Sequence, residues 1–283
     1  MHESKKSGKA SKIIYILLLV VFATIFLVSG GMLLKYFLES QQSQQTYNGL
    51  KDIKGDFTRP TISREEADPT AETTEPAPKF VTVTDPGTGL SIEVLPQYAE
   101  LYTINPDIVG WIKFPNTNVD YPVVQRPENT DYYLYRDFYG KNDKRGCIYA
   151  REVCDIFRPS DNITIYGHRM RDNTMFADLA KLQDKAFWEG NQYIYFDTLR
   201  EYHTYQIIYV LTTTASVGEG FSYHEFVDAG TPGEFDNFIA SCERHQLFDT
   251  GLTATYGDKL ITLSTCEYTH ENGRLVIVAK RID

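Results

Sequence analysis

Cysteine is scarce in this sequence, with four among 283 residues. So few cysteines in a chain of this length exclude a small scaffold that is held together by disulfides. The sequence also lacks a CxxC pair, an HExxH run and EF-hand spacing. We therefore expect no metal site and no cofactor. Pairing of Cys147 with Cys154 stays open, although neighbouring positions on one segment rarely reach disulfide geometry.

Positive charge is also in short supply, because 28 Lys and Arg stand against 38 Asp and Glu and give a net charge of −10. No basic stripe occurs beyond the N-terminal residues. Binding to nucleic acid depends on basic patches that displace counterions from phosphates, so we expect no nucleic-acid partner. Aromatic residues make up 13% of the chain, which favours a β-rich fold because they pack well on pleated surfaces.

One long stretch without charge runs from Ile13 to Leu34. It is about 22 residues long, and a helix needs ~20 apolar residues to cross the hydrocarbon core of a membrane. We predict a transmembrane helix over 13–34. The alternative is a cleavable signal peptide with small residues at 29–31, but the apolar run exceeds the ~7–15 residues of a usual signal core. In both cases the rest of the chain is exported.

The charges beside this stretch predict its orientation. Four lysines lie just before it, namely Lys5, Lys6, Lys9 and Lys12. Positive residues stay on the cytoplasmic side, so we expect a cytoplasmic tail over 1–12, a single membrane pass and an extracellular remainder. Residues 35–90 include a polar stretch rich in Pro, Thr and Glu, which predicts an extracellular stalk or linker. We place the folded domain at 91–283.

Short β-type runs separated by turn residues fill that domain and predict a mainly β fold, a closed or nearly closed barrel of eight strands with peripheral helices. The expected strands are 110–114, 119–124, 146–150, 163–166, 193–196, 205–212, 259–264 and 274–279. The expected helices are 95–103, 175–188 and 232–245. For the second helix, Asn173 or Thr174 is the candidate cap, and the third has a proline in its first turn.

Three residues on this framework can carry chemistry. Cys266 ends an apolar strand and faces a polar loop, where a substrate can reach a thiol. His168 follows another strand, and Arg274 opens the strand after the cysteine loop. Each feature alone is commonly structural. A hairpin would place Cys266 and Arg274 side by side, and this geometry favours a site built from all three.

Together these elements resemble the sortase family, most closely class B. The matching segments are Thr262-Leu-Ser-Thr-Cys266, Tyr166-Gly-His168, Arg274-Leu-Val-Ile-Val, Asp107-Ile-Val-Gly-Trp-Ile112 and Val119-Asp-Tyr-Pro-Val-Val124. The resemblance covers residues from about 95 to 283. It implies an eight-stranded barrel, a single-pass anchor in the cell membrane and a position on a Gram-positive cell surface.

The resemblance also implies a reaction. Cys266 would cleave the C-terminal sorting signal of a secreted surface protein and form a thioacyl-enzyme, with His168 as acid and base and Arg274 as oxyanion stabiliser. An amine would then resolve the intermediate, either on a cell-wall precursor resembling lipid II or on a pilin lysine, with the wall precursor preferred. We assign substrate-binding roles to Tyr166, Ser264, Glu267 and Leu134.

Two departures from class B bear on substrate preference. The chain reads Asn129-Thr130 ahead of Tyr133-Leu134 where class B usually has Asp-Asn, and the step from Cys266 to Arg274 is short. Two other functions also stay open. An exported cysteine protease or amidase would use water as the acceptor, so an added amine would not speed product formation. A non-catalytic adhesion module would leave Cys266 unreactive toward a thiol probe.

Overall fold

The computed structural model describes residues 4–55, 79–214, 216, 220–266 and 272–283. The chain divides into two compact units, Met1–Thr46 and Tyr47–Asp283, and each is described by itself. The boundary falls inside the first helix, so the last turns of that helix belong to the second unit.

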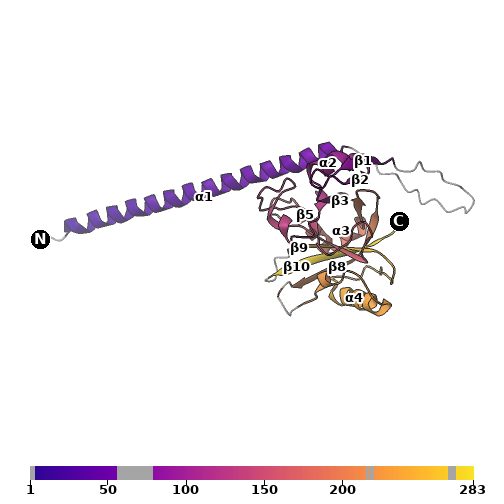
Figure 1. The fold of residues 1–283 in the computed structure, drawn as a ribbon. Coiled ribbons are helices and arrows are strands. Elements are labelled where there is room, and N and C mark those ends of the chain that lie inside the picture. The colour runs from indigo at the N-terminus through magenta and orange to yellow at the C-terminus, as the bar shows by residue number, and fades with distance from the viewer. Residues whose placement is uncertain (1–3, 56–78, 215, 217–219, 267–271) are drawn as a thin grey trace, which may run out of the picture. The chain divides into compact units, whose positions relative to one another are not determined.

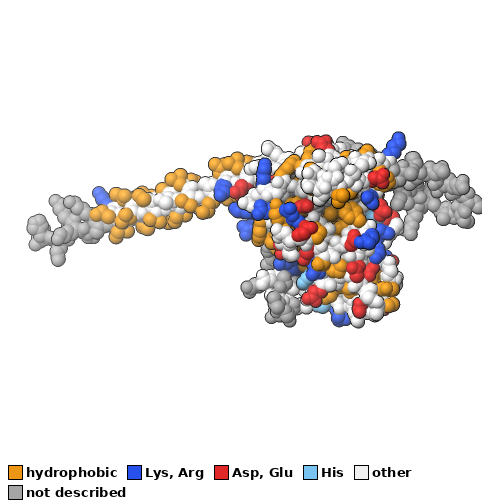
Figure 2. All heavy atoms as spheres, viewed as in Figure 1, with side chains coloured by type: hydrophobic (Ala, Val, Ile, Leu, Met, Phe, Trp, Pro, Cys, Tyr) orange, Lys and Arg blue, Asp and Glu red, His pale blue; other side chains and the backbone are white. Residues whose placement is uncertain are grey.

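The first unit consists of the helix α1 (Ser4–Lys54) up to Thr46. Its apolar side chains from Ile13 to Leu38 are largely exposed, as the orange spheres along the helix show (Figure 2). The helix is long and apolar enough to cross a membrane. It is therefore a candidate membrane anchor, as the uncharged stretch predicts.

The helix does not end at Leu34, where the predicted stalk would begin. It continues to Lys54. Half of the residues from 35 to 54 are Leu, Lys, Glu or Gln, which favour a helix, and Tyr47 and Leu50 are buried in the main core cluster. Gly55 ends it with a positive φ of 72°, and its N–H donates to the Lys51 carbonyl at 2.9 Å. Residues 56–78 of the predicted stalk lie outside the described residues.

A second difference from the predicted stalk is a short hairpin of β1 (Val81–Thr84) and β2 (Ser91–Val94), which crosses the expected domain boundary. Its turn is built on Asp85, whose carboxylate accepts a hydrogen bond from the Gly87 N–H at 2.7 Å. Alternating valines in β1 supply the strand pattern. Such a short run is difficult to distinguish from a linker in a Pro- and Thr-rich region.

The second unit is built around a closed barrel of eight strands, which confirms the predicted fold class (Figure 1). The strands are β3 (Ile108–Lys113), β4 (Asp120–Val124), β5 (Ile148–Ala150), β6 (Asn162–Tyr166), β7 (Tyr193–Thr198), β8 (Thr204–Thr214), β9 (Leu260–Cys266) and β10 (Gly273–Arg281). Their order around the barrel is β10-β8-β7-β3-β4-β5-β6-β9. Most pairs are antiparallel, but β4 with β5 and β6 with β9 are parallel.

Strand β10 shows how the barrel is filled and covered. Leu275, Ile277 and Ala279 belong to the main core cluster, whereas Val276 and Val278 belong to a second one. Side chains alternate between the two faces of a strand, so β10 is buried on both sides. The helix α4 (Pro232–His245) supplies four buried residues to the second cluster and packs beside β8 (Figure 1).

The helices follow the predictions in part. Pro96–Tyr98 (η1) and α2 (Ala99–Ile104) occupy the first expected stretch, and α4 has the expected bounds. The single helix expected over 175–188 is wrong, because the chain forms a 3₁₀ stretch, η3 (Ala177–Gln183), and a separate α3 (Lys185–Gly190). Met175 has a positive φ, and Asp184 leaves helical geometry and caps α3 by accepting from the Ala186 N–H.

Candidate functional site

Cys266 differs from the other three cysteines in its surroundings. It is the last residue of β9 and is half-buried, whereas Cys147, Cys154 and Cys242 are buried. Burial raises the pKa of the Cys147 thiol to about 12, and it raises the pKa values of Cys154 and Cys242 as well. All four thiols are free, so Cys147 and Cys154 do not form a disulfide in this structure. Cys266 is the thiol that combines partial exposure with a strand end.

Arg274 lies directly across from this cysteine. In the antiparallel pairing of β9 and β10, Arg274 is the register partner of Cys266. Side chains at such opposed positions lie on one face of the sheet, with Cβ atoms ~4.5–5.5 Å apart. The guanidinium Nη1 of Arg274 donates to the carbonyls of Gly273 at 3.0 Å and Asn272 at 3.3 Å. The hairpin geometry expected for this pair is confirmed.

The parallel pairing of β6 with β9 brings His168 to the same end of the barrel. Tyr166 is the register partner of Ser264, and the Gly167 N–H donates to the Ser264 carbonyl at 3.1 Å. His168 and Cys266 both follow this pair by two positions. β6 ends at Tyr166 and β9 ends at Cys266, so His168 and Cys266 lie at the same end of neighbouring parallel strands.

Gly167 is required by the space around it. A Cβ at this position would lie 2.5 Å from the Ile148 Cδ1 and 2.6 Å from the Phe176 Cδ2. The Phe176 N–H also donates to the His168 carbonyl at 2.9 Å, so the chain folds back closely on itself here. A side chain at this position would displace Ile148 or Phe176, so glycine is favoured where the chain leaves β6 before His168.

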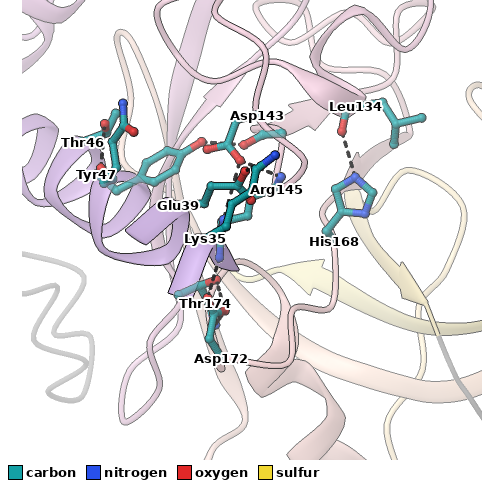
Figure 3. Close-up of polar contacts among 12 residues, drawn as sticks. Lys35, Glu39, Thr46, Tyr47, Leu134, Asp143, Arg145, His168, Asp172 and Thr174 are labelled. Carbon is teal, nitrogen blue, oxygen red and sulfur yellow. Dashed lines mark hydrogen bonds and ion pairs between the residues drawn. The ribbon is translucent and has the colours of Figure 1, made fainter. Parts of the chain in front are cut away.

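The His168 ring is held by the turn η2 (Tyr132–Tyr135). Its Nε2 lies 2.8 Å from the Leu134 carbonyl oxygen (Figure 3). A carbonyl can only accept, so this contact favours the tautomer with a proton on Nε2, which leaves Nδ1 without one in the neutral ring. The Tyr135 ring lies over the imidazole, with centroids 5.6 Å apart and planes tilted by 31°.

The expected substrate-binding residues occupy different environments. Tyr166 is half-buried, and its ring lies 5.3 Å from that of Tyr149. Ser264 is buried, and its hydroxyl lies 2.6 Å from the Tyr223 hydroxyl, so its side chain contacts Tyr223 rather than solvent. Leu134 holds His168 through its carbonyl. Glu267 lies outside the described residues.

Sequence reasoning missed Tyr223, a buried residue in the turn η4 (Tyr223–Glu225). Burial raises the pKa of its phenol, and the charges of Arg274 and Cys266 also act on it. The turn is tied to the barrel by Arg151, whose Nη1 donates to the His224 carbonyl. The segment around Tyr223 has no strand or helix periodicity, so nothing in the sequence marked this residue as part of the site.

Cys266, Arg274 and His168 thus lie at, or just past, the adjoining ends of the neighbouring strands β9, β10 and β6 of an eight-stranded barrel. The sequence model that describes the sortase domain matches residues 112–282 of the chain. The chain belongs to the sortase family. Within the family it is similar to class B sortases, as the sequence motifs predicted.

Two curated relatives are both sortase B proteins. The one from Staphylococcus aureus is 32% identical over 67% of this chain and 76% of the relative. The one from Listeria monocytogenes is 31% identical over 69% of this chain and 78% of the relative. Sortases are cysteine transpeptidases, and a transpeptidase role for this chain follows from its membership.

Solved structures give the same result. Sortase B from Bacillus anthracis, in complex with a compound called AAEK1, superposes with a TM-score of 0.67 at 28% identity and covers 87% of this chain and 99% of that chain. A Staphylococcus aureus sortase B–substrate complex superposes with a TM-score of 0.61 at 32% identity and covers 67% of this chain and 86% of that chain.

Proposed function

We propose that Cys266 is the nucleophile of a sorting reaction, with His168 as its acid and base and Arg274 as the oxyanion stabiliser. The observation that carries this proposal is the convergence of the three residues. Arg274 is the register partner of Cys266, and His168 lies two residues past the end of β6, the parallel neighbour of β9. The other cysteines are buried thiols whose pKa values are raised, so they are poor nucleophiles.

In the first step His168 takes the proton of the Cys266 thiol, and the sulfur attacks the carbonyl carbon of a peptide bond in the sorting signal. The oxygen of that carbonyl becomes negatively charged, and Arg274 donates to it. A guanidinium has five N–H donors, so it can bind this oxygen while Nη1 keeps the Gly273 carbonyl. His168 gives a proton to the leaving amine, the C–N bond breaks, and a thioester to Cys266 remains.

In the second step an amine attacks the thioester and transfers its proton to His168. The C–S bond breaks as a new C–N bond forms, and His168 passes the proton to the departing sulfur, which regenerates the Cys266 thiol. The preferred acceptor is the amine of a cell-wall precursor, and a pilin lysine is the alternative. Water as the acceptor would make the protein a protease or amidase. The Staphylococcus aureus sortase B structure is a complex with a substrate, which supports a substrate site in this chain.

We further propose that the protein is a single-pass membrane protein with its N-terminus in the cytoplasm and its catalytic unit outside. The apolar helix α1 and the lysines before its uncharged stretch support this orientation. In this position the site faces secreted surface proteins that carry a C-terminal sorting signal.

Mass spectrometry tests the proposed chemistry directly. The protein is incubated with a panel of sorting-signal peptides, and an acyl adduct is expected on Cys266 that Cys266→Ala does not form. An added amine should then accelerate product release, whereas an unchanged rate would support the hydrolase alternative. His168→Ala should nearly abolish turnover, and the pH–rate profile of the wild type should be bell-shaped. A folded Cys266→Ala variant with normal turnover would overturn the proposal.

A further inference from the structure

The end of α1 reaches the neighbourhood of the catalytic turn through Tyr47. This tyrosine is buried within the second unit, and its ring meets the Tyr121 ring edge-on at 5.2 Å. Its hydroxyl donates to the Gly146 carbonyl at 2.6 Å and lies 3.4 Å from the Cys147 sulfur. Burial raises the pKa of Tyr47 well above its usual value, so the hydroxyl stays protonated and keeps donating. The ring points toward the segment of Asp143 and Arg145 (Figure 3).

Gly146 is in turn packed against the turn that holds His168. It has a positive φ of 58°, and a Cβ here would lie 2.4 Å from the Leu134 carbonyl oxygen and 2.5 Å from that of Tyr133. The adjacent Cys147 N–H donates to the Tyr133 carbonyl at 3.0 Å. Segment 146–147 is therefore the surface on which the backbone of residues 133 and 134 rests.

The Tyr133 side chain of the same turn is held by hydrogen bonds to residues before β3. The Tyr133 hydroxyl donates to Asp107 at 2.7 Å and accepts from the Asn105 amide at 3.0 Å. These bonds hold the ring. The backbone of the turn is held by the Leu134 N–H, which donates to the Asp131 carbonyl at 2.9 Å, and by the Asp143 N–H, which donates to the Tyr135 carbonyl at 3.0 Å. Gly146 adds the close packing against the Leu134 carbonyl itself. That carbonyl is the acceptor for the His168 Nε2.

We infer that Tyr47 is a positioning residue for His168, acting through Gly146 and the Leu134 carbonyl. The segment that links the membrane helix to the barrel thereby sets the tautomer and the direction of the catalytic imidazole. This inference rests on the proposed function, since it gives His168 the acid and base role. Its structural part, the protonation of Nε2, can be measured without any turnover.

The test replaces Tyr47 by Phe in the full chain, which deletes the hydroxyl and keeps the ring. A small displacement of a catalytic group can lower a rate by up to a hundredfold, so we expect kcat to fall about tenfold with KM within about twofold. Nitrogen NMR of the imidazoles, with His168 assigned by His168→Ala, should show the Nε2–H form losing its dominance. Both readouts distinguish a positioning role from a general loss of stability.

Two variants serve as controls. Tyr209→Phe also deletes a buried tyrosine hydroxyl, which is 3.0 Å from the Thr253 hydroxyl in the second core cluster, and it should leave kcat and the His168 signal unchanged. Cys147→Ala removes the weaker contact of Tyr47 but keeps its bond to Gly146, so turnover should be retained. Melting curves identify a temperature at which every variant is folded.

Gly146→Ala perturbs the Leu134 carbonyl without changing Tyr47, because the added Cβ would lie 2.4 Å from the carbonyl oxygen. It should lower kcat and change the His168 tautomer even if Tyr47→Phe yields little folded protein. An unchanged His168 spectrum and unchanged kcat in either folded variant overturn the inference. A changed His168 tautomer in these variants supports the inference. Retained turnover in His168→Ala would contradict the proposed function and would leave the structural inference standing.

Discussion

Alkylation of the native protein should distinguish Cys266 from the other cysteines by rate. The Cys147 thiol has its pKa raised to about 12 by burial, so at about pH 8 only ~1 in 10⁴ of it is thiolate. An ordinary thiol of pKa ~8.5 is about a quarter ionised at that pH, which is a difference of roughly two thousandfold. A more basic thiolate is also more nucleophilic, by about fortyfold over this range, so a net factor of roughly fifty remains.

Steric exclusion adds to this factor, because Cys147 is 1% exposed and Cys242 is fully buried. The assay is brief treatment with iodoacetamide, followed by peptide mapping in a mass spectrometer, for native protein and for protein unfolded in guanidinium. We expect modification of Cys266 in the native sample and of all four cysteines in the unfolded one. Alkylation of a buried cysteine at a rate within about tenfold of Cys266 in the native protein would refute the reasoning.

Three further predictions follow from named contacts. Gly167→Ala should destabilise the protein by ~1–3 kcal/mol and lower kcat more than a matched Gly190→Ala, where a Cβ meets open space; equal melting temperatures would contradict this. Arg274→Lys and Arg274→Ala should both lower kcat/KM about a hundredfold with little change in melting temperature, and an active Lys variant would remove Arg274 from the mechanism. Burial alone would raise the pKa of Asp161, but hydrogen bonds from the Lys259 ammonium and the Ala229 N–H hold it below its usual value. The stability that this lowered pKa provides is present at neutral pH and is lost as pH falls through the folded-state pKa, below ~4. Asp161→Asn should therefore be less stable than the wild type at neutral pH, and the two melting temperatures should converge in acid. A difference in melting temperature that stays constant with pH would contradict this.

The sequence predicted the barrel well because its strands carry their own signals. Apolar, β-branched runs such as that of β9 are bounded by turn residues, and each expected strand is present with ends shifted by a few residues. The predicted pairing of Cys266 with Arg274 is also confirmed, because two strands joined by a short loop form a hairpin. Local pattern was enough for these features.

Features that depend on contacts distant in sequence were missed. Nothing near Met175 shows that its backbone turns to positive φ, which splits the expected helix. Tyr223 becomes part of the site only because its hydroxyl meets Ser264 across 41 positions of the chain. The continuation of α1 to Lys54 was missed in part for the same reason, since helix-forming residues favour it locally but Tyr47 and Leu50 also become buried in the main core cluster.

The closure of the barrel bears on how the protein behaves in crowded surroundings. Each of the eight strands, as described, pairs with a neighbour on both sides over at least part of its length, so no strand of the barrel presents a whole open edge to a passing chain. In the proposed location the enzyme meets many secreted chains that have just emerged and are not yet folded. Such chains readily add to an exposed sheet edge, and closure denies them this route. A substrate peptide must therefore be recognised by side chains and loops at the mouth of the barrel rather than by joining its sheet.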